Sequence, residues 1–171
     1  LTGGEPCLRD DVAEIVAYAS EKRFSVSMIS NATLMNGKVT QELFDAGLSR
    51  LAASFYHRNP ALHDGFVGLE GAWDKGVEAL RHFTASGGKA TALVMLMNWN
   101  GDAIPDLERF CLDNDWHITV DASIFSRLDG DRSVLKYRAS REQLLYALGK
   151  SELYNGRLKK QVGNRTPEGN I

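Results

Sequence analysis

Two glycines, a carboxylate and a proline follow one another near the amino terminus, as Gly3, Gly4, Glu5 and Pro6. A glycine has no side chain, so a ligand can approach its backbone closely. The Glu5 carboxylate can accept charge-assisted hydrogen bonds from a cationic group such as an ammonium. Because a helical pattern begins immediately afterwards, we interpret this peptide as a ligand loop that follows a strand. The alternative is a tight turn with Glu5 in solvent.

Five further polar residues lie at the ends of apolar runs or within them: Ser30, Asn31, Ser54, Asn98 and Asp121. Ser30, Asn31 and Ser54 can hydrogen-bond a ribose or a carboxylate, but such side chains also cap strand ends and turns. Asn98 could bind a carboxylate or simply begin a loop. Asp121 interrupts an apolar strand, so it either faces the interior of a barrel or caps neighbouring backbone.

The residue types give little support for a metal site or a disulfide framework. Cys7 and Cys111 lie far apart, and His57 and His63 share a loop without a cysteine or carboxylate pattern that would complete a metal site. This cysteine usage favours a reducing, cytoplasmic setting. A net charge of -2 argues against nucleic acid or an anionic membrane surface as a partner. No apolar run reaches the roughly 18 residues of a spanning helix.

Strand-like and helix-like segments alternate along most of the 171 residues, which predicts an α/β fold with a parallel sheet. A helix is expected to begin at a Thr40 cap, and the spacing of Ser140 and Gln143 predicts a capping box before another helix. Ligands of such sheets gather at the carboxyl ends of the strands, where the polar candidates lie. The predicted strands cover residues 24–29, 51–55, 92–97 and 118–122.

Taken together, these strand ends resemble the core of radical S-adenosylmethionine (radical SAM) enzymes. Thr2-Gly3-Gly4-Glu5-Pro6 matches the GGE motif of that family, and Ser30-Asn31-Ala32-Thr33 resembles its TNGT motif with alanine in place of glycine. Asp45-Ala46-Gly47 leading to Ser54 resembles the EAG and VSLDG stretch, although the usual aspartate is absent. The segment from His63 to Gly71 resembles the branch that modifies ribosomally made peptides and carries a SPASM-type cluster domain.

The resemblance covers residues 1–148 and leaves 149–171 as a polar tail. It implies a partial (β/α) TIM-type barrel without its first strand and helix. It also implies a [4Fe-4S] cluster in a longer parent enzyme, held by cysteines upstream of Leu1, so that this chain supplies no metal ligand. We therefore expect the chain to be a fragment that is inactive by itself. The residues implied to bind SAM are Gly3, Gly4, Glu5, Pro6, Ser30, Asn31, Ser54, Asn98 and Asp121.

The implied activity is reductive cleavage of SAM to a 5′-deoxyadenosyl radical, used to modify a peptide or protein. A reductant protein of the flavodoxin or ferredoxin type and a peptide or small-molecule substrate are the implied partners. Two alternatives remain open. One is a radical SAM enzyme of cofactor biosynthesis or sulfatase maturation. The other is a non-catalytic α/β binding domain, if the chain is complete.

Overall fold

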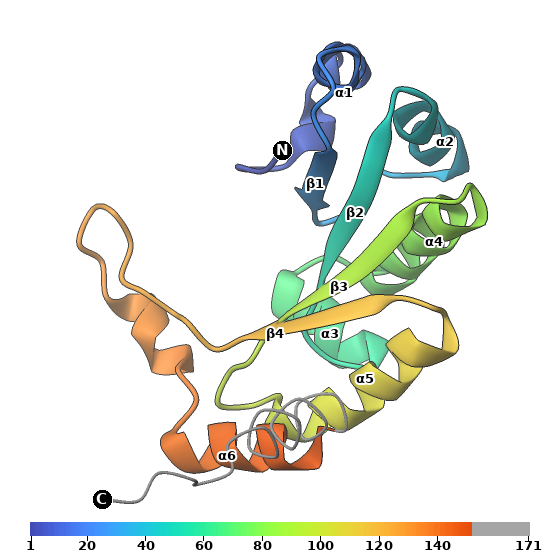
Figure 1. Cartoon of the computed structure of the whole chain (residues 1–171). Helices are drawn as coiled ribbons and strands as arrows, with labels where there is room; N and C mark the ends of the chain where they lie inside the picture. The colour runs from blue at the N-terminus through green and yellow to red at the C-terminus, as the bar shows by residue number, and fades with distance from the viewer. Residues whose placement is uncertain (152–171) are drawn as a thin grey trace, which may run out of the picture.

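A four-stranded parallel sheet forms the centre of the protein, whose computed structural model describes residues 1–151. The strands lie side by side in chain order, as Figure 1 shows. This confirms the predicted parallel α/β fold; the carboxyl end of β2 is as predicted, and the other strand boundaries differ from the prediction by one to three residues. The strands are β1 (Val26–Ser30), β2 (Leu48–Phe55), β3 (Lys89–Met95) and β4 (His117–Asp121).

Helices precede the first strand, connect the strands and follow the last one. The short elements η1, α3, η2 and η3 were not predicted from the sequence. The helices are η1 (Pro6–Leu8), α1 (Val12–Glu21), α2 (Gly37–Asp45), α3 (Pro60–Val67), α4 (Ala72–Ala85), η2 (Gly101–Ala103), α5 (Ile104–Asp113), η3 (Ser133–Tyr137) and α6 (Arg141–Lys150).

The caps of two helices test the sequence reasoning directly. The capping box of α6 is present, because Ser140 accepts from the backbone of Gln143 and the Gln143 side chain accepts from Ser140. The predicted cap of α2 is wrong. Asn36 caps that helix by accepting from Val39 N–H, whereas Thr40 lies one turn inside with its hydroxyl bonded to the Asn36 carbonyl. Asparagine is an equally good cap, so its earlier position decides the start.

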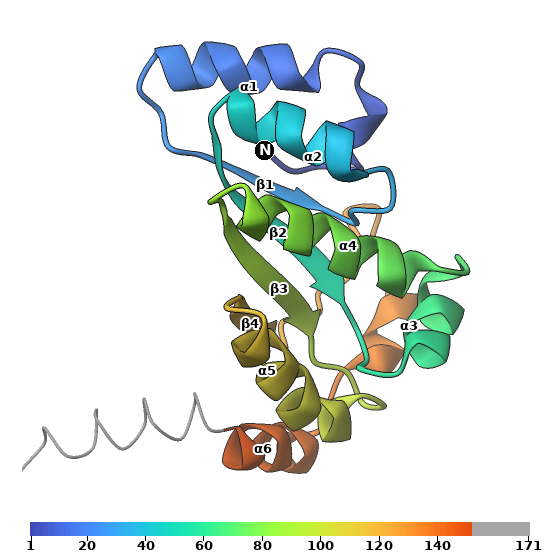
Figure 2. The ribbon, with the colours of Figure 1, turned by 90° about the vertical axis from the view of Figure 1, so that its right-hand side faces the viewer.

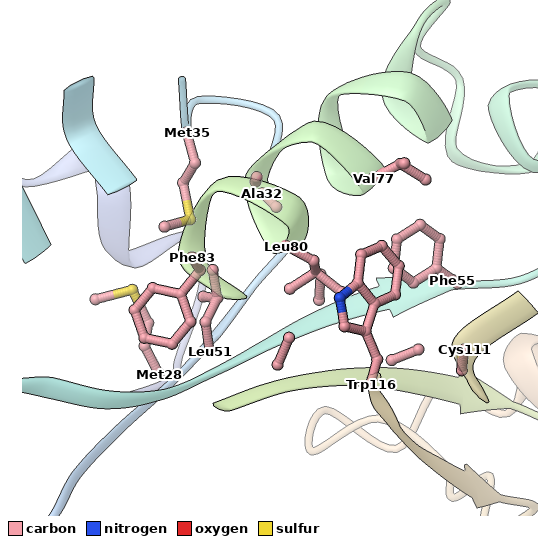
Figure 3. Packing of buried hydrophobic residues seen from close by; sticks show 14 of the residues in the cluster. Met28, Ala32, Met35, Leu51, Phe55, Val77, Leu80, Phe83, Cys111 and Trp116 are labelled. Carbon is pink, nitrogen blue, oxygen red and sulfur yellow. The ribbon is translucent and has the colours of Figure 1, made fainter. Parts of the chain in front are cut away.

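One face of the sheet is covered by α1, α2, α4 and α5 (Figures 1 and 2). Helix α4 shows why: Trp73, Val77, Leu80 and Phe83 recur every three or four residues and form one apolar stripe. This stripe packs on buried side chains of β1 and β2, among them Met28, Leu51 and Phe55 (Figure 3). The hydrophobic core therefore lies between the helices and the sheet.

The opposite face carries side chains that are at least partly exposed. The register aligns Ile29 with Ala52 and Thr91 on this face, and in the next row Ser54 with Leu93. Ile29 is 42% exposed, a large value for an apolar strand residue. The sheet therefore has the form of an open part-barrel, with helices outside and a partly polar interior face.

The amino-terminal residue lies beside the outer edge of β1. The Leu1 carbonyl accepts from Ile29 N–H at 2.9 Å, and its amino group donates to the Ser27 carbonyl. Bonds to residues two apart on one strand are the pattern of a parallel ladder. The edge of β1 is thus paired there in the manner of a further parallel strand.

Helix α6 continues to Lys150, two residues beyond the predicted boundary, and the rest of the predicted tail, 152–171, lies outside the described residues. Within residues 1–151, no helix is both long and apolar enough to cross a membrane.

A pair of glycine substitutions tests the packing. Gly47 has φ +103°, and a Cβ there would lie 2.6 Å from Ser20 Cβ, so Gly47→Ala should destabilise the fold by at least about 2 kcal/mol. Gly65 lies inside α3, and its Cβ would meet nothing within 4 Å. Gly65→Ala should therefore stabilise by roughly 0.5–1 kcal/mol. Urea unfolding followed by circular dichroism measures both, and equal effects would contradict this packing.

Candidate ligand site at the strand ends

The Glu5 carboxylate joins the amino-terminal loop to the end of β1. Its Oε1 accepts from the Ser30 hydroxyl at 2.7 Å and from Cys7 N–H at 3.1 Å, and its Oε2 accepts from Asn31 N–H at 2.8 Å. A carboxylate offers about four acceptor positions. Two N–H or O–H donors contact Oε1 and only one contacts Oε2, so Oε2 is the oxygen that can accept a further hydrogen bond from a ligand.

Asn31 follows β1 directly and is held by Thr33. Its Oδ1 accepts from Thr33 N–H at 2.9 Å and from the Thr33 hydroxyl at 2.8 Å. These two donors assign the oxygen of the amide and therefore its nitrogen as well. No hydrogen bond within residues 1–151 uses Asn31 Nδ2, so an exposed amide donor lies next to the Glu5 acceptor.

The loop before Glu5 leaves space around its backbone. Gly3 has φ +136°, a conformation that residues with side chains rarely adopt, and a Cβ on either Gly3 or Gly4 would meet no atom within 4 Å. Pro6 opens η1, where its fixed φ suits a helical start. The two glycines therefore expose their backbone beside the Glu5 carboxylate.

Ser54 and Asp121 line a hollow of about 250 Å³ on the open face of the sheet, together with Tyr56 and Met95. A hydrogen bond from Ser123 N–H lowers the pKa of Asp121, so its carboxyl is ionised at neutral pH. Burial raises the pKa of Tyr56, so its phenol stays protonated. With Thr119, which also lines it, the hollow combines a carboxylate, three hydroxyls and an apolar surface.

The pairing of β1 with β2 shows how this hollow lies relative to Glu5 and its hydrogen-bond partners Ser30 and Asn31. Ser30, the last residue of β1, pairs with Ala53, and Asn31 and Ser54 are the residues that follow them in the chain. Adjacent strands are about 4.8 Å apart. Glu5, Asn31, Ser54 and Asp121 therefore all lie towards the carboxyl end of the sheet, and Glu5 and Asn31 do not line the hollow that Ser54 and Asp121 share.

Asn98 has a different environment. Its Nδ2 donates to the Lys136 carbonyl at 2.9 Å, and its own carbonyl accepts from Gln143 Nε2 at 2.6 Å. It lines a separate hollow of about 470 Å³ with Trp99 and Tyr146. Its amide is engaged in holding the segment before α6.

Sequence reasoning missed Asn100, which is fully buried. Its Oδ1 accepts from Met97 N–H at 2.7 Å, and its Nδ2 donates to the carbonyls of Tyr56 at 2.8 Å and Met95 at 2.9 Å. This side chain ties the end of β2 to the end of β3. Asn98 and Asn100 follow the same strand, and no pattern in the sequence indicates which of them is buried.

His63 is also buried, in a cluster of aromatic rings that includes Phe55 and Trp73. Its Nδ1 accepts from Tyr56 N–H at 3.3 Å, and burial lowers the pKa of the imidazole. The neighbouring Asp64 accepts from two backbone N–H groups at the start of α4. His63 thus helps to position Tyr56, and Asp64 helps to position the start of α4.

The thiols of the chain do not fit an iron-sulfur cluster. Burial raises the pKa of Cys7 to about 11, with a further contribution from the Glu5 charge, and burial raises the pKa of Cys111 to about 12. Cluster ligands are thiolates, usually three or four of them. Among residues 1–151, no group of three or more histidines, cysteines and carboxylates is arranged to hold a metal ion.

Comparison with known protein families shows to which family the chain belongs. Residues 1–111 match the radical SAM superfamily. The chain belongs to the radical SAM superfamily. The GGE-like loop with Glu5 and the TNGT-like turn with Asn31 both lie inside the matched region.

Two curated radical SAM relatives are similar in sequence. The AdoMet-dependent heme synthase of Methanosarcina barkeri is 38% identical over 84 residues, covering 47% of this chain and 24% of the relative. The GTP 3′,8-cyclase of a Cyanothece species is 36% identical over 124 residues, covering 69% of this chain and 37% of the relative. The chain therefore spans well under half of the length of each.

The fold is shared with Streptococcus suis SuiB. Its crystal structure with S-adenosylmethionine aligns with a TM-score of 0.68 at 18% identity, covering 95% of this chain and 35% of SuiB. Its structure with the precursor peptide SuiA gives a TM-score of 0.69, also at 18% identity, covering 96% of this chain and 35% of SuiB. The radical SAM fold accounts for the parallel sheet and its open face.

The two asparagines after β3 give a matched pair of variants. Asn100→Ala leaves the Met97 N–H and two carbonyls without their partner, so it should destabilise the protein by roughly 2–4 kcal/mol. Asn98→Ala removes an exposed amide and should cost less than about 1 kcal/mol. Chemical denaturation compares them, and similar losses would contradict the role assigned to Asn100.

His63 should make stability depend on pH. Because its pKa is lowered in the folded state, the unfolded chain binds a proton more readily. The contribution of neutral His63 is complete above the unfolded pKa of about 6.5 and decreases as the pH falls below it. Unfolding free energies between pH 8 and pH 5 should thus fall less in His63→Gln than in the native protein. His117→Gln, which alters an exposed strand residue, should keep the native profile.

Proposed function

We propose that this radical SAM protein binds the amino acid end of SAM between Glu5 and Asn31. The observation that carries this proposal is the adjacent acceptor and donor: one open position on Glu5 Oε2 and the Nδ2 of Asn31. The methionine end of SAM carries an ammonium next to a carboxylate. An acceptor for the first and a donor for the second are complementary to it.

The remaining site residues have supporting roles in this proposal. Gly3 and Gly4 allow the ligand to approach the loop, and Pro6 fixes the turn after Glu5. Ser54 and Asp121 lie further along the open face, where hydroxyl and carboxylate groups can bind the ribose. We leave Asn98 outside this site, because its amide donates to Lys136.

SAM on a reduced [4Fe-4S] cluster supplies a 5′-deoxyadenosyl radical, which is the chemistry that the superfamily uses. Neither thiol of the described residues fits the cluster, so we propose no cluster ligand among them. The contribution of this chain is to hold and orient SAM. Glu5 neutralises the ammonium, Asn31 donates to the carboxylate, and the curved open face borders the space for the nucleoside.

We propose peptide or protein modification as the reaction class, with a flavodoxin- or ferredoxin-type protein as the reductant. The fold neighbour SuiB, solved with its precursor peptide, supports the peptide substrate. A second candidate is cofactor biosynthesis, which is favoured by the sequence similarity to a heme synthase and a GTP 3′,8-cyclase.

Substitution of Glu5 tests the site. Glu5→Ala removes the acceptor for the ammonium, so SAM affinity should fall by roughly 1.5–3 kcal/mol, about 10- to 150-fold. Asp11→Asn is the matched control, because the Asp11 carboxylate is exposed and bonded to Arg9. SAM titrations followed by NMR measure both variants. Equal affinity of Glu5→Ala and the native chain would contradict the proposed site.

A further inference from the structure

We propose that the hydroxyls of Ser30 and Thr33 are positioning residues that decide which atoms of Glu5 and Asn31 meet the ligand. The family resemblance implies that Ser30 binds SAM, but its hydroxyl bonds Glu5 and Ala32, so this proposal gives neither hydroxyl a contact with SAM. The Ser30 hydroxyl donates to one oxygen of Glu5, and the Thr33 hydroxyl donates to the amide oxygen of Asn31. These bonds decide whether each side chain presents an acceptor or a donor to the ligand. This inference rests on the proposed function, because the ligand it concerns is the amino acid end of SAM.

Ser30 is only 3% exposed, so it is enclosed by protein and not by ligand. Its hydroxyl donates to Glu5 Oε1 at 2.7 Å and accepts from Ala32 N–H at 2.8 Å. The single hydroxyl hydrogen is thus directed at Glu5. Together with Cys7 N–H, it fills the acceptor positions of Oε1. The atom of Glu5 that is left for the ligand is therefore Oε2, which acts as a hydrogen-bond acceptor.

Thr33 acts in the same way on the other side of the site. Its hydroxyl and its backbone N–H both donate to Asn31 Oδ1, at 2.8 and 2.9 Å. An asparagine amide can turn over and exchange its oxygen and nitrogen with little change of shape. Two donors on one oxygen oppose that exchange, so the amide nitrogen stays outward. The ligand meets a donor at this point.

The turn at Ala32, between Ser30 and Thr33, fixes the positions of both hydroxyls. Ala32 has φ +59° and is fully buried, and it directs Thr33 back towards Asn31. The Ser30 bond to Ala32 N–H stabilises that turn. One buried hydroxyl therefore supports both sides of the site, while Thr33 supports only the carboxylate side.

This division predicts different ligand selectivities. Ser30→Ala should weaken the decarboxylated analogue by about tenfold, because the analogue carries the amine that Glu5 binds, and should weaken SAM by more, because the turn that presents Asn31 to the carboxylate is loosened as well. Thr33→Val should weaken SAM by about threefold and leave the decarboxylated analogue unchanged, because only the carboxylate partner is disturbed. Ser30→Thr, which restores the TNGT residue, and Thr33→Ser keep a hydroxyl and should bind both ligands like the native chain.

The experiment is an NMR titration of the 15N-labelled chain with each ligand. It includes a readout without ligand, the amide proton shifts of Cys7 and Asn31, which donate to Glu5. Ser30→Ala should move both shifts upfield as Glu5 loses its orientation. Ser49→Ala is the matched control, because it removes a serine hydroxyl bond at the opposite end of the sheet, to the Val26 carbonyl at 2.7 Å. It should leave the shifts of Cys7 and Asn31 and both affinities unchanged.

The outcomes separate the two proposals. Unchanged amide shifts and SAM affinity in well-folded Ser30→Ala would overturn the role of Ser30, and an equal effect of Thr33→Val on both ligands would overturn that of Thr33. A native chain without SAM affinity contradicts the proposed function. The amide shifts then still decide whether Ser30 orients Glu5.

Discussion

A single carboxylate connects the two segments on which the candidate site depends. Glu5 accepts from one donor in its own loop and from two donors at the end of β1 that are 25 and 26 residues away in sequence. Charge-assisted hydrogen bonds are stronger than neutral ones, and here three converge on one partly buried group. These bonds hold the glycine loop against the end of β1.

The parallel sheet places these groups at one end, because all of its strands run the same way. Helices cover one face and bury the apolar side chains, so the polar residues of the strands are left on the other face. The buried Asn100 fixes the ends of β2 and β3 relative to one another. The core and the candidate site therefore lie on opposite faces of the same strands. A shift in the pairing register of one strand would displace the side chains of both.

Much of the fold could be predicted from the sequence, and less of the site. Unbroken apolar runs such as 92–97 identified buried parallel strands, and the Ser140–Gln143 spacing identified a cap, because both signals are local. The predicted ligand residues Ser30 and Asn98 illustrate the limit. Both have the right chemistry, but their hydrogen-bond partners come from distant segments, and those partners decide whether a polar side chain faces a ligand or the protein.

Alanine at position 32, where the family motif has glycine, has a consequence for how the site meets its ligand. A left-handed turn built on alanine samples far fewer conformations than one built on glycine, so the turn is ordered before any ligand binds. Binding then loses less conformational entropy at Asn31 and Thr33. The same stiffness leaves the turn little capacity to adjust, which makes this part of the surface a rigid template that favours ligands already matching its shape.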